Sequence, residues 1–341
     1  MRRATPAEYC LIAGIVGCLL LAITAIWRLP AAAQSWLAAY LFWAGLPVGA
    51  LFVTLVHGLT GGRWGVALRL PLAGMVRTMP LAALFLVPVL LAAPHIYPWA
   101  HAGGKGWLGL PFFVVRAVIY IGLWNAIAFG VDRYRQPNGR LLPGFGWPAL
   151  IVLFGTTTLA AFDWIMTLEP RWTSTIYGLL ITSGWVLSAM AVAVAAIAIF
   201  MKHEPESLDA LARIMLALII LWGYLSVIQL VVIWESDLSA EIPWYLRRSS
   251  GGWSLVAALF AAGEFVIPFL VLLWQPLRRS PTAVMAAALT TVVAHLGEIW
   301  WLTVPDFSRP FGWTEPLAVI AIGGCGFFVA GRRFAPGVPV R

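Results

Sequence analysis

Two apolar runs joined by a short polar linker decide the fold, and they lie in residues 147–200, WPALIVLFGTTTLAAFDWIMTLEPRWTSTIYGLLITSGWVLSAMAVAVAAIAIF. Each run is long enough to cross a bilayer as an α-helix, which takes roughly 20 apolar residues. Asp163 nevertheless lies inside the end of the first run, and Glu169 lies just beyond it. Because an ionisable group in the hydrocarbon is costly, Asp163 needs a partner, a water-filled cavity or a function there.

The composition of the whole chain is that of an integral membrane protein. Of the 341 residues, 61% are hydrophobic and 11% are charged, whereas a soluble domain carries about 25% charged residues. No hydrophilic block is long enough for a soluble domain, so we predict one integral membrane domain over residues 1–341. The net charge of +8 is expected to reflect basic cytoplasmic loops rather than a nucleic-acid partner.

Ten apolar runs are long enough to span a membrane, and Pro and Gly interrupt the sequence between them. We therefore predict an all-α polytopic fold with about ten transmembrane helices. The predicted spans are residues 9–27, 34–58, 73–93, 110–131, 147–168, 174–201, 209–234, 252–274, 282–304 and 313–331. The first run is taken as a retained helix rather than a signal peptide, because no clear cleavage site follows it.

Basic residues indicate how the chain is oriented. With a cytoplasmic N-terminus, fifteen of the 22 Lys and Arg residues fall on the cytoplasmic side of the predicted spans and seven on the outer side. The positive-inside rule therefore favours both termini in the cytoplasm. Arg77, near the inner end of the third span, is expected to extend its guanidinium to the interface.

The sequence provides no redox centre. Cys10, Cys18 and Cys325 lie in apolar runs without CxxC, CxxCH or zinc-ligand spacing, so neither a disulfide framework nor covalent haem is predicted. Haem b would need two histidines at matching depth, but His57 and His295 lie roughly 15–20 Å apart in depth when counted along helices. A haem-handling protein of the cytochrome c assembly type therefore fits poorly.

Ionisable side chains lie well inside several predicted spans. Counted at about 1.5 Å per residue, Asp163 lies about 8 Å inside the outer end of the fifth span and Arg116 about 9 Å inside that of the fourth. Glu298 has a similar depth in the ninth span, with His295 one turn deeper on the same face. Glu264 lies near the middle of the eighth span, about 18 Å from its outer end.

Two interpretations of the outer group stay open. Arg116 can pair with Asp163 or Glu298 in a structural ion pair that holds the helices together. Alternatively, these side chains line a polar cavity that is open to the outer face. Both arrangements keep ionisable groups of a membrane protein turned towards protein or water.

Glu264 is harder to explain as a structural residue, since no basic residue lies at its predicted depth. Such a carboxyl is either protonated or part of a proton path. The path would lead outward through the histidine and glutamate of the ninth span to the cavity of Asp163. At the inner end, His57 is a candidate proton donor, and Asn125 in the fourth span is a candidate intermediate.

Three stretches at the predicted outer face together resemble one family. They read FDWIMTLEPRWTSTIYG (162–178), IQLVVIWESDLSAEIPWYLRRSSGGW (228–253) and HLGEIWWLTVPDF (295–307). With the ten predicted spans, these motifs are similar to the ActF-type membrane subunit of bacterial alternative complex III, the quinol:cytochrome c oxidoreductase. That subunit is one of the NrfD-like, polysulfide-reductase-type membrane proteins.

The resemblance implies a fold, partners and a role. The fold would be two antiparallel four-helix bundles with two extra helices, in the bacterial inner membrane beside a larger NrfD-like sister subunit. Further partners would be a periplasmic iron–sulfur protein, c-type haem subunits, a terminal oxidase and membrane lipid. The implied role is that of a subunit without a cofactor of its own, which contributes a proton pathway and a surface facing menaquinone or ubiquinone. The better-defined quinol pocket would belong to the sister subunit.

The resemblance also singles out a periplasmic-face motif, which consists of Asp163, Glu169, Gln229, Glu241 and Tyr245. Members of the family tend to carry two adjacent acids before WYL, whereas this chain reads SAEIP there and keeps only Glu241. A stand-alone relative or a shorter variant of the complex is therefore an alternative within the family.

A secondary transporter with a buried carboxylate as its proton site is the alternative outside this family. Such a transporter is expected to show inverted repeats with broken helices in corresponding positions. Residues 1–168 and 169–341 show no convincing match, and the polar residues are concentrated in the fourth to ninth spans. We therefore prefer the quinol-oxidoreductase subunit, which predicts co-purification with multihaem and iron–sulfur subunits.

Overall fold

The computed structural model describes residues 5–101, 103, 105–136, 138–201, 205–236, 241–307 and 309–331. Within these residues the chain is helical and contains no β-strand, which confirms the all-α prediction. The α-helices are α1 Pro6–Thr60, α2 Arg69–Val76, α3 Met79–Leu91, α4 Ala93–Ile96, α5 Pro98–His101, α6 Leu110–Arg133, α7 Pro143–Trp164, α8 Tyr177–Phe200, α9 Pro205–Ser236, α10 Ile242–Arg248, α11 Trp253–Phe260, α12 Ile267–Leu273, α13 Gln275–Arg278, α14 Pro281–Thr303 and α15 Thr314–Gly331. The shorter helical turns are η1 Arg63–Gly65, η2 Gly106–Leu108, η3 Met166–Leu168, η4 Ala261–Val266 and η5 Val304–Asp306.

Nine helical segments in the described part of the chain are long and apolar enough to cross a membrane, as expected of a multi-pass membrane protein. Some of them join neighbouring elements, such as α2 with α3, α7 with η3 and α14 with η5. The number differs from the ten predicted spans because α1 contains the first two of them.

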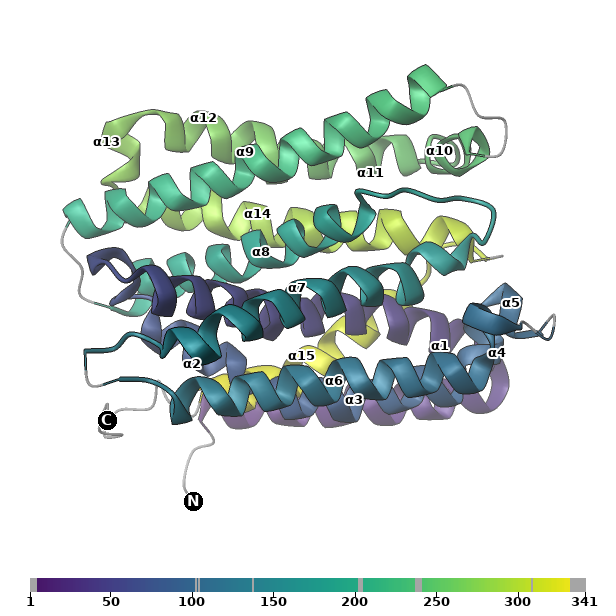
Figure 1. Ribbon diagram of the computed structural model, residues 1–341. Coiled ribbons are helices and arrows are strands. Elements are labelled where there is room, and N and C mark those ends of the chain that lie inside the picture. The colour runs from purple at the N-terminus through teal and green to yellow at the C-terminus, as the bar shows by residue number, and fades with distance from the viewer. Residues whose placement is uncertain are drawn as a thin grey trace.

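The 55-residue helix α1 is a hairpin rather than one straight helix. Arg28 interrupts it with φ −143° and ψ 56°, two residues before Pro30, and a proline lacks an N–H donor and crowds the preceding turn. Both arms contact the same part of α15. Trp43 Nε1 donates to an α15 carbonyl 2.8 Å away, and a Cβ added at Gly14 would lie 2.8 Å from an α15 backbone nitrogen. Figure 1 shows the two arms running back along each other.

The helices run side by side, and their ends form two layers (Figure 1). The layer with α4, α5 and α10 is called the α10 end, and the layer with α13, the start of α1 and the end of α15 is called the α13 end. A Cβ added at Gly331 would lie 3.9 Å from Cβ of Ala7. The described chain therefore begins and ends in the same layer, while the side of the membrane on which that layer lies stays a prediction.

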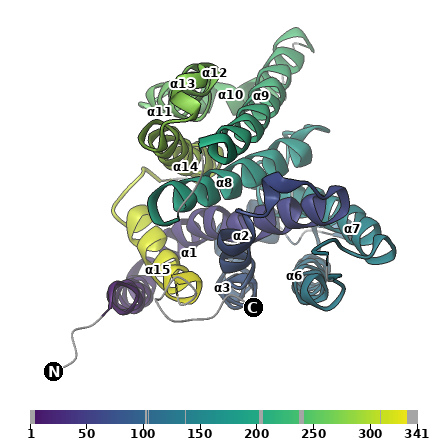
Figure 2. The same ribbon diagram turned by 90° about the vertical axis from the view of Figure 1, so that its left-hand side faces the viewer.

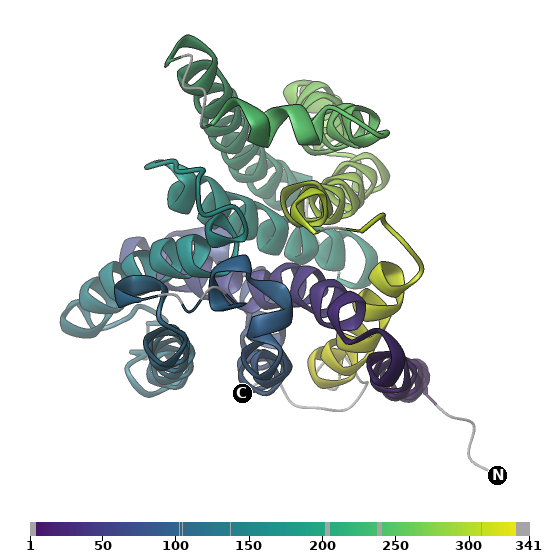
Figure 3. The same cartoon turned by 90° about the vertical axis from the view of Figure 1, so that its right-hand side faces the viewer.

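The centre of the bundle is α8, which contacts α1, α2, α7, α9 and α14 and lies in the middle of both end-on views (Figures 2 and 3). Close approach of α1 depends on glycine, because a Cβ added at Gly45 or Gly49 would overlap the side chain or the carbonyl of Trp185. Small residues serve this purpose in membranes, where helices associate through close packing. The division into two four-helix bundles stays a prediction.

A π-helical turn, η4, interrupts the eighth predicted span between α11 and α12. Pro268 provides a physical cause, because it has no N–H for the carbonyl of Glu264 four residues earlier and its ring crowds that carbonyl. Gly263 lets η4 approach α14 closely, since a Cβ there would lie 2.9 Å from Cβ of Ala294. Single π turns inside α-helices are rare and frequently occur at functional sites.

Candidate functional site

Three ionisable side chains meet in the interior, where η4 packs against α14. Nδ1 of His295 lies 3.2 Å from Oε1 of Glu264 and 2.8 Å from Oε2 of Glu298. The exposed fractions of Glu264, His295 and Glu298 are 0%, 2% and 5%. One imidazole nitrogen therefore faces two buried carboxylates, and the three side chains are called the carboxylate cluster below.

Four segments position the carboxylate cluster. The π turn supplies Glu264, and α14 supplies His295 and Glu298, which share one face because they are three residues apart. From α9, Trp222 Nε1 donates to Oε1 of Glu298 at 3.1 Å. On α8, Gly184 leaves room for the imidazole, because a Cβ there would lie 2.9 Å from Cε1 of His295.

Two atoms of the cluster lack a hydrogen-bond partner among the described residues, namely Oε2 of Glu264 and Nε2 of His295. A buried polar atom without a partner is expensive, so such atoms are places where a proton, a water molecule or a cation binds. Two carboxylates and an imidazole whose ligand atoms lie within 4.8 Å of one another also form a possible divalent-metal site. The chemistry available here is therefore reversible binding of positive charge.

We expected no basic residue at the depth of Glu264, and its contact with His295 shows that this expectation was wrong. The structure brings Nδ1 of His295 within 3.2 Å of the Glu264 carboxylate. Depth was counted along ideal α-helices from their ends, and such a count ignores both the π turn and the reach of side chains along the helix axis. Glu264 is therefore one member of a cluster rather than an isolated carboxyl.

Arg116 and Asp163 form a second, separate group near the α10 end. Arg116 Nε and Nη2 donate to the two Asp163 oxygens, both at 2.8 Å. Tyr120 Oη and Trp107 Nε1 add donations at 2.9 and 3.0 Å, and the Trp107 ring lies 4.0 Å from the guanidinium carbon. Asp163 is 1% exposed, so it lies in a closed, bidentate ion pair and does not line the open cavity that was the other interpretation.

Aromatic side chains lie between these two groups. The rings of Trp124 and Trp164 are 5.6 Å apart, and those of Trp124 and Trp185 are 6.5 Å apart. Three buried donors of this layer have no partner among the described residues, namely Tyr40 Oη, Trp164 Nε1 and Trp185 Nε1. No direct hydrogen bond within the described part of the chain connects the carboxylate cluster with Asp163, so the predicted outward route is not continuous in side chains.

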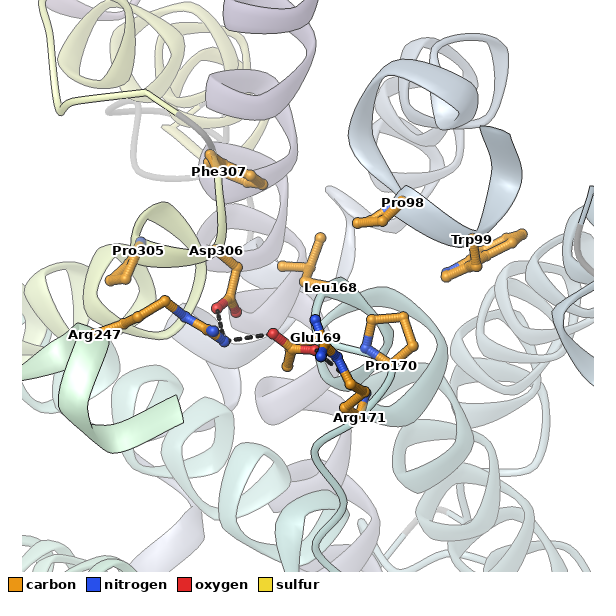
Figure 4. A pocket seen from close by; sticks show the side chains of 10 residues that line it. All are labelled: Pro98, Trp99, Leu168, Glu169, Pro170, Arg171, Arg247, Pro305, Asp306 and Phe307. Carbon is orange, nitrogen blue, oxygen red and sulfur yellow. Dashed lines mark hydrogen bonds and ion pairs between the residues drawn. The ribbon is translucent and has the colours of Figure 1, made fainter. Parts of the chain in front are cut away.

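A pocket of about 670 Å³ at the α10 end contains Glu169 of the periplasmic-face motif. Figure 4 shows Arg247 between two carboxylates across this pocket. Its Nη2 lies 2.6 Å from Oε2 of Glu169 and 3.3 Å from Oδ1 of Asp306. Arg248, which is fully buried, adds a 2.6 Å contact with Oδ2 of Asp306. These two arginines and Asp306 were not predicted as site residues, although all three belong to the quoted motifs.

The other motif residues also gather at the α10 end. Gln229 Oε1 accepts a hydrogen bond from Ser174 at 3.1 Å, and Gln229 Nε2 donates to Tyr245 Oη at 3.4 Å. Burial raises the pKa of the Tyr245 phenol, and the hydrogen bond with Gln229 opposes that effect. Glu241 Oε1 accepts from Thr173 at 3.4 Å. These contacts fasten the segment before α8 to α9 and α10.

His57 and Asn125 lie together at the opposite end of the bundle. Both line a pocket of about 410 Å³ near the α13 end. His57 Nε2 lies 3.1 Å from the carbonyl of Gly62, and Asn125 Nδ2 donates to the carbonyl of Ile121 at 2.8 Å. Neither side chain hydrogen-bonds to the carboxylate cluster within the described residues.

Comparisons with known proteins leave the family open. No protein-family model matches the sequence, and no curated protein sequence matches it significantly. The functional argument therefore rests on the quoted motifs and on the geometry of the carboxylate cluster.

Proposed function

We propose that this chain is a cofactor-free membrane subunit of a quinol-oxidising complex of the alternative complex III type, and that the carboxylate cluster is a protonatable site on its proton pathway. The observation that carries the proposal is the burial of two carboxylates against one imidazole nitrogen at a π turn. A purely structural cluster would be expected to satisfy its polar atoms, as the Arg116–Asp163 pair does for its carboxylate. The carboxylate cluster instead keeps Glu264 Oε2 and His295 Nε2 without partners among the described residues.

In this proposal His295 mediates between the two glutamates. A protonated Glu264 transfers its proton from Oε1 to Nδ1 of neutral His295 across the 3.2 Å contact, which leaves a carboxylate and an imidazolium. The imidazolium then gives the same proton to Oε2 of Glu298 across the 2.8 Å contact. Trp222 donates to the other oxygen of Glu298 and stabilises the ionised carboxylate between transfers.

Beyond the cluster the proton would move through water. The unpartnered donors of Tyr40, Trp164 and Trp185 mark polar positions in the aromatic layer where ordered water can bind. Asp163 would stay fixed beside this route, because both of its carboxyl oxygens accept hydrogen bonds from Arg116. The pocket of His57 and Asn125 would lie on the opposite side of the bundle, where the proton is taken up.

The partners belong to the proposal as well. A larger NrfD-like sister subunit would bind beside this chain, and periplasmic iron–sulfur and c-type haem subunits would dock on the α10 end. The pocket lined by Glu169, Arg171 and Arg247 gives that end a polar recess for such a partner. Menaquinone or ubiquinone would bind in the sister subunit or at its boundary with this chain.

The test is the variant Glu264→Gln in the purified complex, reconstituted into proteoliposomes. Glutamine keeps the size and the hydrogen bonding of the side chain but cannot ionise. We expect a normally assembled complex that releases fewer protons per electron or oxidises quinol more slowly. Glu235→Gln, which changes an exposed carboxylate at the end of α9, is the matched control.

Two outcomes would overturn the proposal. Unchanged proton release and turnover in Glu264→Gln would show that the cluster has only a structural role, as a group of hydrogen-bonded side chains. A stable monomer that moves a solute across liposomes in response to a proton gradient would instead favour the secondary transporter.

A further inference from the structure

The pocket at the α13 end carries an excess of positive charge. It lies between α1, α2, α3 and α6 and has a volume of about 410 Å³. Three guanidinium groups line it, those of Arg69, Arg77 and Arg135, against the single carboxylate of Asp132. The break between α2 and α3 at Arg77 helps to form it, because the chain turns there at the pocket wall.

These three arginines differ from those nearer the α10 end. Five arginines there each lie within 3.7 Å of a carboxylate oxygen, namely Arg116, Arg171, Arg247, Arg248 and Arg309. The pocket arginines form no ion pair with any carboxylate among the described residues. Asp132 is the one carboxylate among the described residues that line the pocket, so it balances at most one of the three positive charges.

Like charges also approach each other in the pocket. Arg135 is partly buried and donates from Nη1 to the carbonyl of Gly139 at 3.2 Å. Burial and the positive charge of Arg69 lower the pKa of Arg135, and Asp132 only opposes this effect. Bringing guanidinium groups together without a carboxylate in contact favours the binding of an anion from outside.

Apart from Thr54, His57 and Asn125, the rest of the pocket wall is apolar, and it reaches the outside of the bundle. Leu72, Val76 and Phe129 form part of its wall, and Phe129 is 78% exposed on the outside of the bundle. A ligand that fills the pocket would therefore carry an anionic group at one end and apolar chains at the other. Basic pockets between membrane helices on the cytoplasmic side bind anionic lipid headgroups in other proteins, and the basic residues predict a cytoplasmic α13 end.

We propose that this pocket binds the phosphate group of an anionic phospholipid. Arg69, Arg77 and Arg135 contact the phosphate, and the acyl chains extend along the wall formed by α2, α3 and α6. The same pocket contains His57 and Asn125, where the proposed function places proton uptake, so a bound phosphate would lie beside that step. The lipid assignment itself rests on the charge and the lining of the pocket and not on the proposed function.

The test measures lipid retained by the full-length protein after reconstitution with phosphatidylglycerol or phosphatidylcholine, by native mass spectrometry and by protection against thermal unfolding. The variant Arg69→Gln/Arg77→Gln/Arg135→Gln is expected to lose phosphatidylglycerol affinity about fivefold per arginine, the equivalent of about 1 kcal/mol each. The control variant removes three arginines of the same end that do not line the pocket, Arg133, Arg140 and Arg279, and is expected to retain the lipid.

A second variant distinguishes loss of lipid binding from misfolding of the triple variant. Ala73→Glu places a carboxylate in the pocket wall, so the protein should fold without lipid and lose its protection by phosphatidylglycerol. Equal retention of the two lipids by the wild type, or equal retention by both triple variants, would overturn the proposal. Protection of the wild type by inorganic phosphate as strong as that by phosphatidylglycerol would show a free-anion site and overturn the lipid assignment.

Discussion

Removing one partner of the Arg116–Asp163 pair measures how strongly a closed ion pair stabilises this bundle. In Arg116→Gln, Asp163 keeps two of its four hydrogen bonds, those from Tyr120 and Trp107, but its charge stays buried without a counter-ion. Breaking a buried pair on one side costs about 3–5 kcal/mol. The two remaining donors put the expected loss near the lower limit, at about 3 kcal/mol or roughly 100-fold in the folded-to-unfolded ratio.

The assay is equilibrium unfolding in mixed micelles with increasing SDS, for Arg116→Gln, Asp163→Asn and the double variant. The double variant buries no charge, so it should recover most of the loss, and the double-mutant cycle should give a coupling of roughly 2 kcal/mol. A double variant whose loss equals the sum of the two single losses would refute the reasoning. So would an Arg116→Gln protein as stable as the wild type.

Two further predictions concern the carboxylate cluster and the α10 end. Gly184→Ala puts a methyl group 2.9 Å from Cε1 of His295, so it should displace the imidazole, lower the free energy of unfolding by about 1–3 kcal/mol and slow proton release. Unfolding and proteoliposome assays on the same preparation measure the two effects. A variant with unchanged stability and proton release would contradict the close packing of Gly184 against His295. Arg248→Gln should destabilise the protein by about 3 kcal/mol, because Asp306 loses its buried partner. Arg171→Gln should change it by less than about 1 kcal/mol, since that side chain is 89% exposed; equal losses in unfolding assays would contradict the difference in burial.

The sequence predicted the membrane helices because apolar run length has a direct physical meaning. It did not predict that the first two apolar runs belong to one helical element. Helix α1 has only one non-helical residue, Arg28, between its two arms, whereas the sequence indicates two separate spans. Arg116 and Asp163 were recognised as possible partners because their predicted depths agree and their charges are opposite. That argument uses only position along each helix.

The carboxylate cluster shows where such depth counting fails. The contact between Glu264 and His295 depends on the π turn and on the rotation of two helices, and neither follows from counting residues along a span. Pro268 was the available sign, because a proline four residues after Glu264 disturbs the helix there. Arg248 and Asp306 were missed for a related reason, since Arg248 ends the short helix α10, Asp306 ends the turn η5, and their contact depends on how these two elements meet.

The α1 hairpin has a consequence for synthesis. Its first arm packs Gly14 and Gly17 against α15, but α1 ends at Thr60 and α15 begins at Thr314. At roughly 5–20 residues per second, the ribosome takes roughly 10–50 seconds to make the intervening chain. During that time the face of the first arm that carries Gly14 and Gly17 has no α15 to pack against. A nascent chain that stops before α15 contains the first arm without the helix that packs on Gly14 and Gly17, so this contact closes only after α15 has been made.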